Sequence, residues 1–93
     1  MNDESSIVKM AKALSDPHRL RIFRWVIQRG SLTVGQAQQL TFLAQPSVSF
    51  HIKQLTESEL LRAVKKGRTI YLFVNQGKLD EFRAFFGQIG QEP

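Results

Sequence analysis

Between Leu43 and Asn75 the sequence predicts a helix that leads directly into a β-hairpin, and this order constrains the fold more than any other feature of the 93-residue chain. Helical periodicity over 45–58 gathers apolar residues on one side, at Val48, Ile52 and Leu55. Two β-rich segments follow, 61–65 and 69–74, and Lys66-Gly67 can form a two-residue turn between them. The helix is therefore expected to pack one side on the core and to expose the other.

Capping signals divide the rest of the chain into further helices. Asp16-Pro17 has the N-cap and first-turn residues of a helix that ends before Gly30. Thr33 and Gln36 have the spacing of a capping box, which opens a short helix to about residue 40. A turn over 41–44 joins it to the helix at 45–58 as a helix-turn-helix unit. Other helices are predicted over about 3–14 and 78–89.

These elements predict one domain over residues 1–93, mainly α with a small β-hairpin. The fold class is a winged helix-turn-helix, with four helices, two strands and a last helix in chain order. The helix-turn-helix unit is expected at 33–58 and the wing at 61–74.

The other helices also carry apolar stripes, and that of the second helix is predicted to be interior. The second helix carries Leu20, Ile22, Phe23, Val26 and Ile27. The first carries Ile7, Met10, Ala11 and Leu14. The last carries Leu79, Phe82, Phe85, Phe86 and Ile89. This last stripe is too large for a lone chain of 93 residues to cover.

Positive charge is concentrated in the middle of the chain, whose overall net charge is +5. Between Pro17 and Val74 nine lysines and arginines accompany only Glu57 and Glu59, whereas each flank carries two basic and three acidic residues. A polyanion such as nucleic acid is the natural partner of this field. The alternative is an ordinary solubilising surface charge.

Several classes of protein are excluded by what the chain lacks. It has no cysteine, so disulfides, thiolate metal sites and thiol redox sensing are excluded. No apolar run approaches the roughly 18 residues of a membrane helix, and no signal-peptide pattern opens the chain; a cytoplasmic protein without membrane partners is expected. No catalytic motif is present, so we expect neither an enzyme nor a cofactor.

The exposed side of the helix at 45–58 has the chemistry of a DNA-reading face. Its candidate contacts are Gln45, Ser47, Ser49, Phe50, Lys53 and Gln54. Glutamine, serine and lysine can hydrogen-bond base edges or phosphates in the major groove. The alternative is a plain solvated face, which has little use for an aromatic at its centre. Phe50 suits either a thymine methyl or another protein surface.

Four cations belong to the predicted wing: Lys65, Lys66 and Arg68 at its tip and Arg62 at its base. They suit backbone phosphates or a narrow minor groove, although charge can also simply protect an exposed hairpin. His18 and His51 are candidate phosphate contacts, but a lone histidine at the edge of a core stripe is more often a structural hydrogen-bonding group. Two histidines without cysteine make a transition-metal site unfavourable.

Three motifs resemble those of the ArsR/SmtB family of bacterial winged-helix repressors. ALSDPHRLRI at 13–22 is similar to the family's "ALADPTRLRIL", QPSVSFHIKQL at 45–55 to its "SQPTVSHHLKVL", and GRTIYLFVN at 67–75 to its "GRWVYYRLN". The resemblance covers about 9–75 in register. It implies double-stranded DNA as partner and a homodimer built through the first and last helices (1–15 and 78–93), bound to an operator with dyad symmetry. The implied interface residues are Ile7, Met10, Leu14, Leu79, Phe82, Phe85, Phe86 and Ile89.

Departures from the family pattern bear on the signal. Thr33 and Gly35 stand where metal-sensing members carry cysteines, and the last helix offers only the adjacent Asp80 and Glu81. We therefore expect a homodimeric repressor that senses neither metal nor thiol chemistry, released by an unidentified inducer or sequestering protein. The alternatives are a protein-interaction module on a winged-helix scaffold and a sensor of a non-metal small ligand at the dimer interface.

Two further departures concern helix ends. Ala44 replaces the family's Ser N-cap, which should weaken that helix end by about 1 kcal/mol. Glu59 replaces a glycine that usually ends the same helix, so a non-glycine residue at positive φ, or a different exit turn, is expected.

Overall fold

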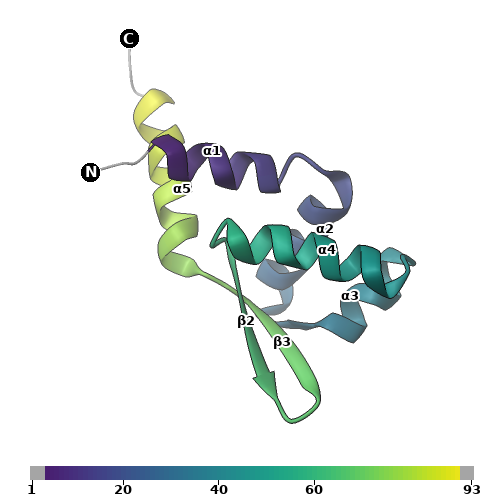
Figure 1. Cartoon of the computed structure of the whole chain (residues 1–93). Coiled ribbons are helices and arrows are strands. Elements are labelled where there is room, and N and C mark those ends of the chain that lie inside the picture. Colours follow the sequence, from purple (N-terminus) through teal and green to yellow (C-terminus); the bar gives the residue numbers. More distant parts are fainter. Residues whose placement is uncertain (1–3, 91–93) are drawn as a thin grey trace.

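The computed structural model describes the backbone of residues 4–90 and the side chains of residues 4–87. The elements in chain order are α1 (Glu4–Ala13), α2 (Pro17–Arg29), β1 (Leu32–Thr33), α3 (Val34–Thr41), α4 (Gln45–Glu57), β2 (Leu61–Lys66), β3 (Thr69–Val74) and α5 (Gln76–Gly90). The predicted winged helix-turn-helix order is confirmed. In Figure 1, α1 and α4 lie one above the other, α2 and α3 lie behind α4, and the β2–β3 hairpin projects away from the helices. None of the described helices is both long and apolar enough to cross a membrane.

The predicted caps are present and explain where the helices begin. The Asp16 carboxylate accepts hydrogen bonds from the backbone N–H groups of His18 (2.8 Å) and Arg19 (3.1 Å) at the start of α2. Thr33 and Gln36 form the reciprocal capping box of α3, with N···O distances of 2.9 and 3.0 Å. Gly30 ends α2 at a φ of 84°, a left-handed conformation that glycine adopts at little cost.

A strand that the sequence did not predict completes the sheet. β1 has only two residues, and it pairs antiparallel with β3 to give the order β1-β3-β2. The pairing of Lys66 with Thr69 places the turn of the wing at Gly67-Arg68, with Gly67 at a φ of 62°. The predicted Lys66-Gly67 turn was therefore one residue too early, because Lys66 still belongs to β2 and only glycine readily takes the first left-handed position.

The core lies where α1, α2 and α4 meet the root of the sheet. Its largest fully buried side chains are Met10, Ile22, Val26, Leu32, Val48, Leu55, Leu60, Leu61 and Leu72. Val48, Ile52 and Leu55 all face inward from α4, as predicted. The prediction for α2 was wrong at two positions, since Leu20 and Ile27 are each 42% exposed. The described chain covers each of them only in part.

Both ends of α4 have the features expected from the two departures from the family pattern, at Ala44 and at Glu59. Ala44 takes the extended conformation of an N-cap (φ −66°, ψ 152°) but supplies no side-chain hydrogen bond. After the helix, Glu59 has a φ of 68°, which confirms a non-glycine residue in the left-handed region. Its carboxylate lies 3.6 Å from Nζ of Lys78 on α5. An ion pair of this kind at the surface contributes little to the free energy of unfolding. The strained backbone therefore determines most of the effect that Glu59 has on stability.

We expect Glu59→Gly to stabilise the protein by up to about 1 kcal/mol. A left-handed conformation costs an L-residue roughly 1–2 kcal/mol, against which glycine loses about 0.5–1 kcal/mol of chain entropy. Denaturant unfolding of Glu59→Ala provides the matched control: alanine keeps the strained φ, loses the ion pair and should not stabilise. Equal effects of the two substitutions would contradict the backbone explanation.

Candidate nucleic-acid interface

The outward side of α4 carries most of the predicted reading residues. Ser47, Ser49, Phe50 and Lys53 are all exposed, opposite the buried Val48 stripe. The Lys53 ammonium lies 3.9 Å from Glu57, but both side chains remain largely in water, so the pair holds the lysine only weakly. These groups are free to meet a ligand that approaches the outer side of α4.

Phe50 remains an exposed aromatic at the centre of this face. It is 54% exposed, and its ring and that of His51 form an edge-type pair with centroids 5.8 Å apart. Both interpretations of Phe50, a contact with a thymine methyl and a contact with another protein, therefore require a partner molecule.

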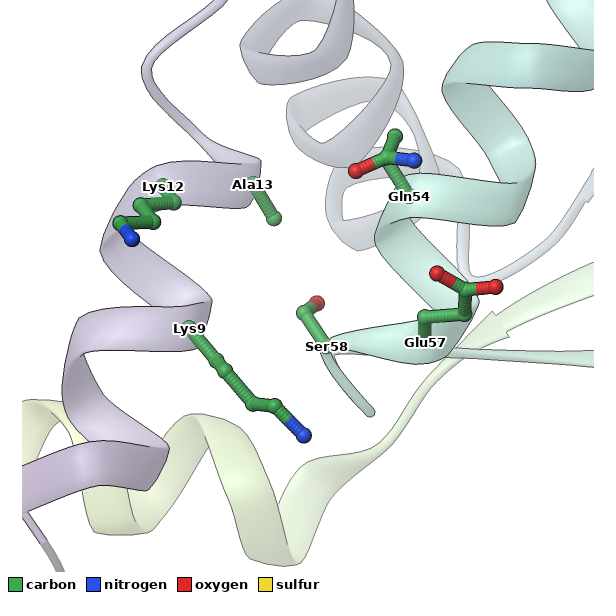
Figure 2. A pocket seen from close by; sticks show the side chains of 6 residues that line it. All are labelled: Lys9, Lys12, Ala13, Gln54, Glu57 and Ser58. Atoms are coloured by element: carbon green, nitrogen blue, oxygen red, sulfur yellow. The ribbon is translucent and has the colours of Figure 1, made fainter.

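Gln54 differs from the other predicted reading residues in its surroundings. It is half-buried and lines a cavity of about 380 Å³ between α1 and the second half of α4, with Lys9, Lys12, Ala13, Glu57 and Ser58. Figure 2 shows these side chains around the gap between the two helices. Gln54 thus faces α1 rather than the outer side of α4. On the helical wheel Gln54 lies between the core side and the outer side of α4. The sequence alone could not assign it to either side, because that requires knowing where α1 packs.

The N-terminus of α4 meets the wing across a shared groove. Gln45, the first residue of α4, lines a hollow of about 460 Å³ with Gln38 of α3 and with Arg68 and Ile70 of the hairpin. The helix-turn-helix unit and the wing thus border one continuous surface. The free N–H groups at a helix N-terminus favour a phosphate here. The sequence offered no signal for Gln38, because its place depends on the short strand β1.

The wing presents its cations at the tip, as predicted. Lys65, Lys66 and Arg68 are all exposed. Nζ of Lys66 lies 5.9 Å from the centre of the Tyr71 ring, a weak cation–π contact that leaves the charge in water. Arg62 lies at the root of the hairpin, beside a hollow that Thr56, Glu59 and Asn75 also line. It is therefore separated from the other three.

Comparison with known proteins places this geometry in a family. Residues 14–64 match a family model described as a helix-turn-helix domain. The transcriptional repressor SdpR of Bacillus subtilis (strain 168) is 31% identical over 70 residues, which are 75% of this chain and 77% of SdpR. The arsenic resistance transcriptional regulator ArsR1 of Pseudomonas putida is 33% identical over 60 residues, 64% of this chain and 47% of ArsR1. The chain belongs to the ArsR family of transcriptional regulators.

Solved structures agree with the fold of this ArsR family regulator. The crystal structure of an ArsR family transcriptional regulator superposes with a TM-score of 0.85, over 96% of this chain and 91% of that one, at 24% identity. The resemblance stated from the three motifs is thereby confirmed. Proteins of this family and fold are DNA-binding transcriptional regulators and not enzymes.

The two histidines of the regulator lie in a polar cluster between the beginning of α2 and α4. The His51 side chain is only 13% exposed, and its Nδ1 lies 3.3 Å from Nη1 of Arg19 and 3.8 Å from the Asp16 carboxylate. The His18 and His51 ring centroids are 5.6 Å apart. Arg19 also donates from Nε to the carbonyl oxygen of Ala13 at 2.7 Å and so links the end of α1 to α4. His51 therefore acts as a structural group, with little surface left for the predicted phosphate contact, whereas His18 keeps part of its surface.

Burial lowers the pKa of the His51 imidazole below its usual range, and Arg19 and His18 lower it further, against the opposing effect of Asp16. The folded ring therefore binds a proton less readily than the unfolded one. We expect the free energy of unfolding to be fully retained above about pH 6.5, the ordinary pKa of histidine, and to fall as the pH drops below it. Unfolding of the wild type and His51→Gln at neutral and mildly acidic pH would test this. The variant should have the flatter profile, and identical profiles would contradict the assignment to His51.

The residues predicted at a dimer interface differ in how far one chain already buries them. Ile7 and Met10 are 5% and 0% exposed within one chain, so they belong to the core and offer no surface to a second copy. Leu14, Leu79, Phe82 and Phe85 are partly buried against that core. Phe86 remains 51% exposed, and its ring packs edge-on against those of Phe82 and Phe85, with centroids 5.0 and 5.5 Å away. The side chain of Ile89 lies outside the described residues.

Val8 on α1 is an open apolar position that the sequence did not single out. It is 50% exposed, because the inward stripe of α1 runs through Ile7, Met10 and Ala13 instead. The exposed Ala11 lies one turn further along the same side. Among the described residues of α1 and α5, the two helices that were expected to pair, Val8 and Phe86 are the large apolar side chains that remain exposed.

The carboxylates of α5 are engaged within the regulator itself. Asp80 accepts a hydrogen bond from the Gln76 amide at 2.9 Å, and Glu81 lies 3.3 Å from Nζ of Lys78. Within residues 4–87, no group of three or more histidine, cysteine, aspartate or glutamate side chains could hold a metal ion.

Proposed function

We propose that this regulator is a homodimeric repressor that binds a dyad-symmetric DNA operator in the cytoplasm. The outer side of α4 enters the major groove, where Gln45, Ser47, Ser49, Phe50 and Lys53 meet base edges and nearby phosphates. The wing follows the flanking backbone with Lys65, Lys66 and Arg68. The observation that carries this proposal is the groove that Gln45 and Arg68 line together, because it lets one duplex touch both elements.

Pairing of two chains is supported by the apolar surface left open on α1 and α5. Val8 and Phe86 are each about half exposed, so each of the two helices keeps apolar surface that a second copy can cover. In this proposal the two copies meet along these helices, and each copy supplies one recognition helix. The repressor role is supported by the likeness to SdpR, which is named a transcriptional repressor.

The signal in this proposal is neither a metal ion nor a thiol reaction. The full chain contains no cysteine, and Asp80 and Glu81 already have partners within α5. A chelator and added zinc should therefore leave operator affinity unchanged. In this proposal, an inducer or a sequestering protein of another chemistry releases the repressor from its operator.

Selection from random duplexes with the purified protein tests the proposal directly. We expect an inverted repeat whose half-site centres lie about 10–10.5 base pairs, or a multiple of this, apart. Sedimentation of the complex should give two chains per duplex, and Phe86→Asp should yield monomers with much weaker binding. Enrichment of an unpaired half-site, or of no sequence at all, would refute the repressor model. A second candidate function, protein recognition through Phe50, would then be favoured.

A further inference from the structure

The cavity between α1 and α4 is separate from the outer side of α4. It holds about 380 Å³, near the lower end of the range for small-molecule pockets. Ala13 and Ser58 are its short, buried residues, while Lys9 and Lys12 come from α1 and Gln54 and Glu57 from α4. In Figure 2 the Lys9 side chain extends into the gap, and Lys12 lies further along α1. The walls of the cavity therefore belong to two different helices.

The polar groups around this cavity are largely without partners. Among the described residues, neither lysine lies within ion-pair distance of a carboxylate, and the Gln54 amide makes no hydrogen bond. Glu57 has only its 3.9 Å contact with Lys53 on the water side of α4. Lys9 on one wall and Glu57 on the other thus line the cavity without touching each other, and the ion-pair partner of Glu57 among the described residues is the exposed Lys53. Such an arrangement suits an occupant that carries both charges.

We propose that this cleft binds a small zwitterion of the amino-acid type. Its carboxylate would lie against Lys9 and its ammonium group against Glu57. The Gln54 amide, which can both donate and accept, would bind either end. Glu57 disfavours a pure anion such as phosphate, and Lys9 disfavours a simple amine. The ligand would bridge α1, a helix proposed for dimerisation, and α4, the proposed recognition helix.

Binding is measured without DNA, so its outcome is independent of the proposed operator function. The protein amino acids are the probes, tested singly by thermal shift and then by calorimetry. We expect at least one to bind with a dissociation constant of about 1 mM or tighter. Succinate and inorganic phosphate are control probes that carry only negative charge, and ethanolamine is a control probe that carries only positive charge. These three probes should bind at least tenfold more weakly.

Variants of the two walls locate the site. Lys9→Gln and Glu57→Gln should each weaken binding by about tenfold or more, as expected for the loss of a charge-assisted contact. Both residues are exposed, so the fold should persist, and thermal unfolding checks that it does. Arg24→Gln, on the exposed side of α2, removes one charge elsewhere and should not alter binding. The proposal is overturned if no amino acid binds, if phosphate or succinate binds as well, or if the wall variants bind like the wild type.

Discussion

Replacing Ser47, Ser49 and Lys53 together with alanine is expected to abolish sequence-specific DNA binding while leaving a folded dimer. All three side chains are exposed on the outer side of α4, and a good contact to a base edge contributes about 1–3 kcal/mol of discrimination. Loss of three contacts should lower specific affinity by about a hundredfold or more. Alanine favours helix formation, so α4 itself should not be weakened.

Gel-shift titration of the selected operator against an unrelated duplex measures this effect. The unrelated duplex should lose far less affinity, because its binding rests on phosphates. A control triple, Arg21, Arg24 and Gln28 to alanine, lies on the exposed side of α2. It removes more positive charge but should retain the preference for the operator. An unchanged operator affinity of the α4 variant would show that the recognition helix has been assigned wrongly.

Replacing Lys65, Lys66 and Arg68 with serine should weaken binding to every duplex and reduce its dependence on salt. Each phosphate contact releases condensed counterions, so its loss should lower the slope of log K against log salt by about 0.9. The tip of the wing projects from the fold (Figure 1), and its three cations lie in water. The protein should therefore remain as stable as the wild type.

The two sets of variants should fail in different ways. The α4 variant is expected to lose specificity with most of its salt slope intact. The wing variant should lose affinity on operator and random DNA alike. A wing variant that loses only operator binding, at an unchanged salt slope, would instead make the wing a reader of bases.

Short-range chemistry explains why most element boundaries could be predicted. The caps at Asp16 and at Thr33 with Gln36 act within four residues, so no tertiary knowledge was needed. The inward side of α4 followed in the same way from its spacing. The positive φ of Glu59 was also foreseen, since the departure from glycine identified the position.

Long-range packing explains the rest. Periodicity predicted an apolar stripe on α1, but it could not tell that the same chain covers Met10 fully and Val8 only by half. In the same way, Leu20 and Ile27 extend the stripe of α2 beyond the surface that its neighbours cover. Gln54 was placed on the reading side because its neighbour α1 is about 40 positions away in sequence. The strand β1 has too few residues to produce any pattern.

That two-residue strand sets a limit on how the regulator can fit DNA. Leu32 pairs with Leu72 and Thr33 with Tyr71, and α3 begins at the next residue. The strand pairing thus joins the hairpin to the beginning of the helix-turn-helix unit, so the hairpin is not connected to it through a flexible linker alone. We expect its reach from the groove to the flanking backbone to act as a ruler of constant length. One base pair inserted within a half-site should then lower the affinity strongly. Changes in the spacer between half-sites would instead be accommodated at the dimer interface.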